Sequence, residues 1–224
     1  MSRVSVPVIT YRWITFLLAI GYVAYQFGTG DWSNPGGPLR FLTIWALVLS
    51  AYSAWRMLSI SLGKSDHPYE VPAMTASVFN IMVVYLYWKL FLINPDLVNG
   101  NGPIIWHQEY YLHGLGPALQ LIDAVFIGQV FRRIWRGAAV LLLMVPIYVL
   151  WAEMFVQPLN DTPVGSVTSG LPYPFLNNME WPARAEFYVL YGGIALAILT
   201  ALSGVGWVVK RSRSTVGSAK RPPV

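Results

Sequence analysis

Long apolar stretches alternate with short polar segments along the chain. Six of them are long enough to be membrane helices, at residues 10–28, 39–62, 72–94, 108–131, 137–156 and 183–209. A helix needs about 20 mostly apolar residues to cross a bilayer, and backbone groups inside lipid must bond within their own segment. The pattern therefore predicts an all-α polytopic bundle of six transmembrane helices in a domain over residues 1–211, followed by a basic, disordered tail at 212–224.

Composition supports the membrane class. Hydrophobic residues make up 55% of the chain and charged residues only 11%, whereas a soluble domain carries about 25% charge. Cysteine is absent, which excludes disulfides, thiolate metal ligands and a cysteine nucleophile. The first apolar stretch is of membrane length and has no small-x-small cleavage pattern after Tyr25, so we expect it to remain as a helix.

Basic residues gather on one side of this six-helix arrangement. They lie at the N-terminus, in the second and fourth connections and in the tail: Arg3, Arg12, Arg56, Lys64, Arg132, Arg133, Arg136, Lys210, Arg211, Arg213, Lys220 and Arg221. Cytoplasmic loops of membrane proteins carry such an excess, so both termini are predicted to be cytoplasmic. The net charge of +5 follows from this asymmetry and indicates contact with anionic membrane lipids. A nucleic-acid partner is not predicted.

The connections on the opposite side are longer, at residues 30–38, 95–107 and 157–182, and are rich in Gly, Pro, Asn and aromatic residues. Such composition is typical of turns, and the last connection exceeds the usual length of an unstructured loop. Two interpretations stay open. The connection forms a lid over a pocket, or it pads the bilayer surface with Tyr173 and Trp181 as interfacial anchors.

Ionisable residues collect near the outer third of the predicted helices. These are Arg40, Lys89, Glu109, His113, Glu153 and Glu186. A charged group at membrane depth costs at least about 2.5 kcal/mol, so such residues face a bundle interior or a wet cavity. For Lys89 we favour a side chain that reaches outward to the head groups. The others point to a site.

One face of the predicted helix 108–131 is polar. A rotation of about 100° per residue places five side chains within a stripe about 80° wide: Glu109, His113, Gly116, Gln120 and Asp123. Because lipid offers no hydrogen-bond partners, the stripe must turn inward. It then forms either a functional site or a set of interhelical hydrogen bonds, and for Gln120 we favour the second interpretation.

Thr43 and His113 are predicted to lie at the same depth. Thr43 is three or four residues inside its helix and His113 about five, so at roughly 1.5 Å per residue both lie about 5–8 Å below the outer surface. A hydroxyl becomes a nucleophile when a nearby base takes its proton, and imidazole suits that task near neutral pH. Two other interpretations remain open: the two side chains simply bond each other, or Thr43 bonds its own backbone.

Neighbouring charges have different predicted roles. Glu153 and Glu186 reach the same level and either orient His113, hold a substrate head group or sit at the interface as plain charges. Asp123 lies about 15 Å deeper, so we expect a structural role with Arg132 or with the second helix. No metal or cofactor is predicted, because His107 and His113 are six residues apart and diverge by about 120° on a helix, unlike the i, i+4 histidines of zinc proteases.

Three motifs in order resemble a known family. They are Gly-Gly-Pro-Leu-Arg-Phe-Leu-Thr at 36–43, His113 followed by Pro117 and Asp123, and Tyr-Pro-Phe-Leu at 173–176. The run resembles the androgen-induced membrane hydrolase family, which includes the androgen-dependent TFPI-regulating protein and bacterial relatives. The resemblance implies six membrane helices and hydrolysis of fatty acid esters of hydroxy fatty acids by a threonine and a histidine, here Thr43 and His113. It also implies a bacterial relative located in the cell (inner) membrane.

The leading hypothesis is thus a membrane threonine hydrolase of lipid esters. Further residues are candidates for substrate binding or support: Arg40, Glu109, Tyr110, Gly116, Pro117, Glu153, Asn177 and Glu186. The candidates for the group that donates a hydrogen bond to the oxyanion are Asn177, Asn178, Tyr110 and Arg40. Two alternatives are a transporter or proton-coupled carrier that uses the polar stripe, and a non-catalytic lipid-binding membrane protein.

Overall fold

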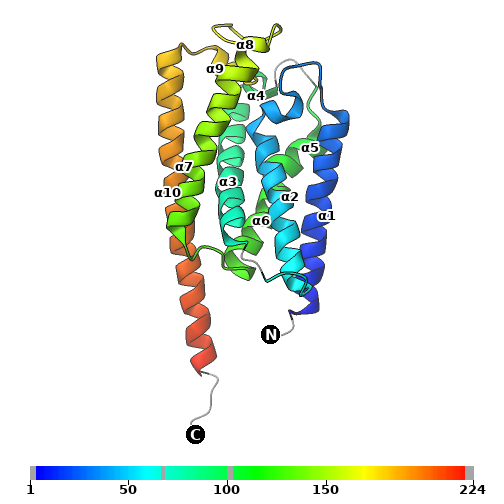
Figure 1. Ribbon diagram of the computed structural model, residues 1–224, viewed down its shortest axis with the longest axis vertical. Helices are drawn as coiled ribbons and strands as arrows, with labels where there is room; N and C mark the ends of the chain where they lie inside the picture. Colours follow the sequence, from blue (N-terminus) through cyan, green and yellow to red (C-terminus); the bar gives the residue numbers. More distant parts are fainter. Residues whose placement is uncertain (1–3, 67–68, 100–102, 220–224) are drawn as a thin grey trace.

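The computed structural model describes residues 4–66, 69–99 and 103–219. Long helices stand side by side along the long axis of the molecule, and the short elements gather at one end, which we call the loop end (Figure 1). The long helices are α1 (Val6–Thr29), α2 (Leu42–Ser61), α3 (Glu70–Ile93), α7 (Ile134–Trp151) and α10 (Trp181–Ala219). The short elements at the loop end are η1 (Gly37–Arg40), α4 (Asp96–Asn99), α8 (Gln157–Leu159) and α9 (Pro174–Asn177). No strand occurs in the described residues, so the predicted all-α class is confirmed.

Membrane-spanning character is clear for part of the bundle. Among the described residues, four helices are long and apolar enough to cross a membrane, at Val6–Thr29, Glu70–Ile93, Ile134–Leu159 and Trp181–Ser212. Their outward faces expose large apolar side chains, for example Val189 at 77% exposure and Leu142 at 62%. Such a surface suits lipid rather than water. The chain is therefore an integral membrane protein.

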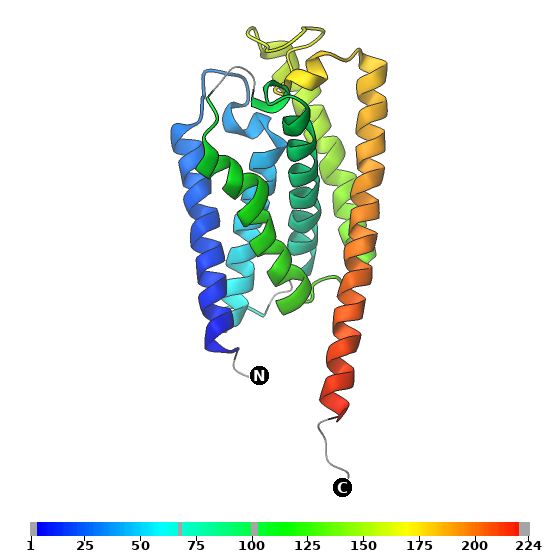
Figure 2. The ribbon, with the colours of Figure 1, turned by 180° about the vertical axis from the view of Figure 1, so that it is seen from behind.

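The predicted fourth helix is not a regular α-helix. It consists of α5 (Trp106–Tyr110), the π-helical segment η2 (Tyr111–Leu115), α6 (Gly116–Ile122) and a second π-helical segment η3 (Asp123–Ile127). It crosses the bundle obliquely between α1 and α3 and over α2 (Figure 2). A third π-helical segment, η4 (Ala152–Val156), continues α7 into α8. Periodicity alone does not reveal such bulges, which are frequent at functional sites.

Close packing of α2 against α3 forms the centre of the bundle. The small residues Ala46, Ser50 and Ala54 of α2 are buried, and Asn80 Nδ2 of α3 donates a hydrogen bond to Ser50 Oγ at 2.9 Å. Small side chains let helix backbones approach closely. The face of α2 that carries these small residues therefore packs inward.

The end opposite the loops is held by a buried ion pair. The guanidinium of Arg12 in α1 binds both carboxylate oxygens of Asp123 through one edge, at 2.7 Å from Nε to Oδ2 and 2.7 Å from Nη2 to Oδ1. Arg12 Nη1 also donates to the carbonyl oxygen of Met57 in α2 at 3.1 Å. Asp123 thus has the structural role that we expected, but its charged partner is Arg12 and not Arg132, because α1 lies against this end of the bundle.

The last helix is longer than predicted. We expected it to end near residue 209 with a disordered tail from 212, whereas α10 continues to Ala219. Residues 210–219 contain no proline, and the Lys, Arg and Ala residues among them are good helix formers, whereas Ser, Thr and Gly are weaker ones. The rest of the tail lies outside the described residues.

Candidate active site

Thr43 and His113 meet between α2 and η2. Thr43 is the second residue of α2, and its Oγ1 lies 3.5 Å from Nε2 of His113. His113 is buried, with 6% of its surface exposed. The distance is longer than an ideal hydrogen bond, as is common for catalytic pairs without substrate. The two side chains therefore lie side by side, as their equal predicted depth led us to expect.

The π-helical turn at His113 has a local cause. Pro117 has no N–H, so the carbonyl of His113 loses the partner that a regular helix would supply. Trp88 of α3 replaces it and donates from Nε1 to the His113 oxygen at 2.7 Å. The backbone of His113 departs from helical values, with φ −113° and ψ 20°. Pro117 thus acts through the backbone, because it frees the carbonyl that anchors this turn to α3.

Gly116 permits the same turn to close. A Cβ at this position would lie 3.0 Å from the carbonyl oxygen of Tyr111 and 3.1 Å from the Tyr111 ring. The Tyr111 ring stacks in turn on Tyr22 of α1, with centroids 3.7 Å apart. Gly116 therefore contributes the space in which Tyr111 packs against this turn.

Two neighbours fix the imidazole of His113. Tyr87 of α3 stacks on the ring, with centroids 3.5 Å apart and planes 2° from parallel. Glu109, one turn earlier in the chain, places Oε2 3.0 Å from Nδ1, although Nδ1 has no well-aligned hydrogen bond within the described residues. A base oriented by a third group is the recurring arrangement behind an activated hydroxyl. Thr43, His113 and Glu109 have this arrangement.

The start of α2 is held by two tyrosine hydroxyls. The backbone N–H of Leu42 donates to the hydroxyl of Tyr173 at 2.8 Å, and the hydroxyl of Tyr148 donates to the carbonyl of Arg40 at 2.9 Å. Burial raises the pKa of the Tyr173 hydroxyl above its ordinary value, so this group stays neutral. Because Leu42 precedes Thr43, Tyr173 positions Thr43 through the backbone.

The glycine pair of the first motif shapes the turn before α2. Gly36 and Gly37 have φ values of +78° and +49°, a region that L side chains rarely adopt. A Cβ at Gly37 would lie 2.6 Å from the ring of Trp32. The two glycines therefore let η1 fold tightly under Trp32 and direct the chain into α2.

A cavity of about 350 Å³ surrounds the Thr43–His113 pair. One part of its wall is polar and belongs to α1, α4 and α5 near the loop end: Gln26, Asn99, Gln108 and Glu109. The larger part is apolar and belongs to α3, α7 and α10: Phe79, Met82, Val83, Leu86, Leu90, Val145, Val149 and Phe187. The volume lies within the range of small-molecule sites. The cavity thus offers an apolar chamber beside a polar centre.

The long loop before α10 takes part in the cavity wall. Tyr173, Phe175 and Leu176 line the cavity, and Asn177 holds the loop from inside. The Asn177 side chain accepts from Ser169 Oγ at 2.8 Å and Leu171 N at 2.9 Å, and its Nδ2 donates to the carbonyls of Val164 and Leu171. All polar atoms of the Asn177 side chain are thus engaged within the loop, which leaves no free donor for a substrate.

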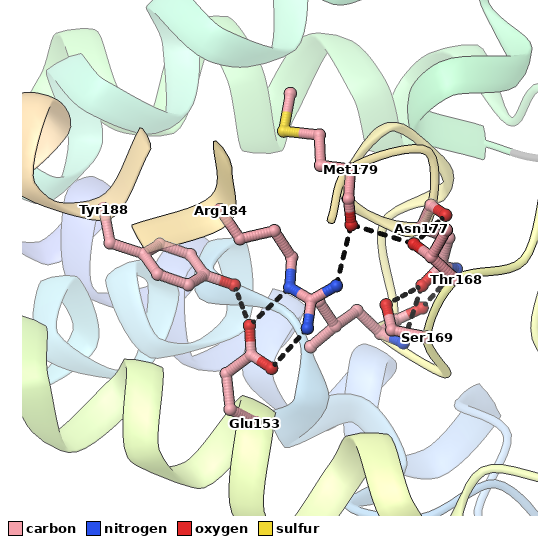
Figure 3. Close-up of polar contacts among 8 residues, drawn as sticks. Glu153, Thr168, Ser169, Asn177, Met179, Arg184 and Tyr188 are labelled. Carbon is pink, nitrogen blue, oxygen red and sulfur yellow. Dashed lines mark hydrogen bonds and ion pairs between the residues drawn. The ribbon is translucent and has the colours of Figure 1, made fainter. Parts of the chain in front are cut away.

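Glu153 lies in a separate cluster beside this loop (Figure 3). Arg184 binds the Glu153 carboxylate at 2.9 and 3.2 Å, and the hydroxyl of Tyr188 donates to it at 2.7 Å. Arg184 Nη1 also donates to the carbonyl of Met179 at 2.8 Å. Glu153 therefore ties η4 to α10 and to the loop, and the structure does not bring it to His113.

Other predicted candidates lie outside the cavity wall. Arg40 places its guanidinium over the ring of Phe41, 4.9 Å from the centroid. Tyr110 is 58% exposed and stacks on Trp106, and Glu186 is exposed on α10. Asn178 Oδ1 accepts from the backbone of Ser166. Of the residues proposed from the sequence, those that line the cavity are Thr43, Glu109 and His113.

The polar stripe of the oblique helix is buried as predicted. Gln120 donates from Nε2 to the carbonyl of Ser50 at 2.8 Å, which confirms the interhelical hydrogen bond that we favoured for it. Lys89 is exposed, with Nζ 3.5 Å from the hydroxyl of Tyr191. In the residues that the structure describes, no group of three His, Cys, Asp or Glu side chains is placed to hold a metal.

Sequence reasoning missed three residues of the site. Tyr87 appeared only as an aromatic residue of an apolar helix. Tyr173 appeared in the Tyr-Pro-Phe-Leu motif and as a candidate interfacial anchor, but neither tyrosine was marked as a neighbour of His113 or Thr43. Gln26 carried a weak signal, because it is a lone amide near the end of the apolar first helix. Their roles depend on contacts between distant segments.

Comparison with known proteins identifies the family. No curated protein and no solved structure matches the chain. The model of the FAR-17a/AIG1-like protein family matches residues 2–206, which covers the first helix as well as the three motifs. This match confirms the family that the motifs indicated. The chain, with its paired threonine and histidine above an apolar cavity, therefore belongs to the FAR-17a/AIG1-like protein family.

Proposed function

We propose that this protein is an integral membrane hydrolase of lipid esters, with Thr43 as nucleophile and His113 as general base. The observation that carries the proposal is the 3.5 Å approach of Thr43 Oγ1 to His113 Nε2, with Glu109 on the other side of the ring at 3.0 Å. A serine or threonine beside an oriented imidazole is the usual machinery of acyl transfer.

The chemistry follows from this order of groups. Thr43 Oγ bonds to the ester carbonyl carbon while its proton passes to His113 Nε2. The tetrahedral intermediate then breaks its bond to the alcohol oxygen, and Nε2 returns the proton to that leaving oxygen. Water adds to the acyl-threonine with His113 again as base, which releases the fatty acid and restores the Thr43 hydroxyl.

The cavity suits an ester with a long apolar part. Phe79 lies eight residues before Tyr87 on α3, so the apolar wall extends about 12 Å below the imidazole. An acyl chain there would lie along α3, α7 and α10 with its carbonyl at Thr43. Fatty acid esters of hydroxy fatty acids, the substrates that the family resemblance implies, have such a chain.

The proposed topology has six membrane crossings, with both termini on the cytoplasmic side of a cell membrane. Helix α1 begins and α10 ends at the end of the bundle opposite the loop end (Figure 1). The connection after α2, with Lys64, and that before α7, with Arg132 and Arg133, also lie there. The positive-inside preference makes that end cytoplasmic, so the active site opens near the other membrane surface.

The transporter alternative has less support from the contacts. Along the polar stripe, Gln120 is bonded to the Ser50 carbonyl and Asp123 is held by Arg12. A proton relay needs groups that can exchange hydrogen-bond partners. Gln120 and Asp123 are each held by a fixed partner instead. An ester hydrolysis assay distinguishes an enzyme from a protein that binds lipid without hydrolysing it.

The test is ester hydrolysis by purified protein in detergent. With a fatty acid ester of a hydroxy fatty acid as substrate, Thr43→Ala and His113→Ala should each lower kcat at least ~10³-fold, by the scale of known triads. Thr200→Ala is a matched control, because Thr200 is an exposed threonine on α10 bonded to its own helix. A fluorophosphonate probe should label Thr43 only when His113 is present. Wild-type rates in folded Thr43→Ala protein would refute the proposal.

A further inference from the structure

Gln26 has a buried amide without a partner. It lies on the buried face of α1 together with Arg12, Thr15 and Ala19, and it is 9% exposed. Its Nε2 makes no hydrogen bond within the described residues. Buried polar groups nearly always have a partner, so an unpaired donor calls for a physical reason. The buried Gln120 shows the ordinary case, because its Nε2 donates to the Ser50 carbonyl at 2.8 Å.

The Gln26 side chain lines the same cavity as Thr43 and His113. The packing of α1 against α2 also places it at the level of Thr43. Leu47 of α2 packs with Leu18, Tyr22 and Val23 of α1, and the two helices run in opposite directions (Figure 1). One turn toward the loop end from this contact leads from Leu47 to Thr43 and from Tyr22 to Gln26.

Among the described residues, the oxyanion donors suggested from the sequence are engaged elsewhere or lie outside the cavity wall. Asn177 uses its amide within the loop, Tyr110 is exposed, and the Arg40 guanidinium lies over Phe41. Acyl transfer depends strongly on a donor that is already directed at the oxyanion.

We propose that Gln26 Nε2 donates a hydrogen bond to the carbonyl oxygen of the bound ester and stabilises the oxyanion that forms when Thr43 attacks. The proposal rests on the hydrolase function proposed above. No proton is transferred by Gln26: the carbonyl π electrons move to oxygen as the Thr43 Oγ–carbon bond forms, and they return when the leaving oxygen departs. The amide is unpaired in the free enzyme because its partner is the substrate.

The test compares two buried glutamines replaced by a side chain of similar length. Gln26→Met should lower kcat ~10²- to 10³-fold, the usual effect of losing one oxyanion donor, while KM changes less than about threefold, because the contact forms mainly in the transition state. The melting temperature should stay the same or rise, since an unpaired buried amide is removed. Gln120→Met should have the opposite effects, with a lower melting temperature and a kcat within about twofold of wild type, because it removes the buried hydrogen bond from Gln120 to the Ser50 carbonyl.

Three results would overturn the inference. The first is a kcat for Gln26→Met within about twofold of wild type. The second is a rise in KM alone, which would make Gln26 a ground-state binding group. The third is a loss of kcat accompanied by a lower melting temperature in both Gln26→Met and Gln26→Leu, which would indicate a structural role. Thr43→Ala in the same assay separates the two proposals, because an active Thr43→Ala protein refutes the hydrolase mechanism itself.

Discussion

Tyr87 lies flat against the imidazole of His113, with ring centroids 3.5 Å apart and planes 2° from parallel. This contact joins the centre of α3 to the π-helical turn η2. It fixes the plane of the imidazole, so that Nδ1 faces Glu109 and Nε2 faces Thr43. A histidine on a distorted helical turn thereby has one orientation, which a general base requires.

Loss of the Tyr87 ring should loosen this orientation. Tyr87→Ala should lower kcat ~10- to 100-fold, because small displacements of a catalytic group are costly. Tyr87→Phe keeps the stacked ring and should keep kcat within about threefold of wild type. Steady-state hydrolysis by both purified variants checks this, and equal losses in the two would mean that the hydroxyl, not the ring, is what matters.

Glu109 should support the charged imidazole that forms during the reaction. Glu109→Gln removes the negative charge 3.0 Å from Nδ1 and should lower kcat ~10²-fold, within the range typical of acid–base assistance. The exposed Glu180 of the loop offers a control, and Glu180→Gln should leave kcat unchanged. An undiminished kcat in Glu109→Gln would show that His113 needs no carboxylate.

Tyr173 should act on Thr43 through the backbone. Tyr173→Phe leaves the partly buried N–H of Leu42 without its 2.8 Å acceptor, and an unpaired donor of this kind costs up to about 1–3 kcal/mol. We expect a lower melting temperature together with a kcat reduced ~10-fold, as the start of α2 shifts. Hydrolysis and thermal unfolding of the same preparation provide both readouts. A stable variant with normal kcat would contradict the positioning role.

The buried Arg12–Asp123 pair should matter for stability and not for chemistry. Removing one partner, as in Arg12→Met, leaves a buried charge and should cost about 3–5 kcal/mol. The double variant Arg12→Met/Asp123→Leu should recover much of this loss. Since Asp123 lies about 15 Å from His113 along the helix, kcat of the folded protein should stay near wild type in each case. A double-mutant cycle in thermal unfolding measures the coupling.

Sequence reasoning reached the Thr43–His113 pair because depth in a membrane is countable from the ends of apolar stretches. Helix periodicity likewise placed Gln120 and Asp123 on an inward face. Periodicity did not identify Arg12 as the partner of Asp123, nor Tyr87 and Tyr173 as neighbours of Thr43 and His113. The hydrophobic period of one helix does not specify which other helix packs against it. The π-helical turn was not predicted from Pro117. The hydrogen bond that replaces the missing N–H of Pro117 comes from Trp88 on another helix.

The depth of the apolar chamber should set the preferred acyl length. Phe79 is 1% exposed and lines the cavity about two turns below Tyr87, so its ring limits how far a chain reaches. Phe79→Leu removes part of that ring with a modest loss of packing and should shift the best substrate toward longer acyl chains. Phe131→Leu is the control, because Phe131 belongs to the same buried cluster and does not line the cavity. Comparison of kcat/KM over a series of esters that differ only in acyl length checks this, and an unchanged optimum in Phe79→Leu would place the chain elsewhere.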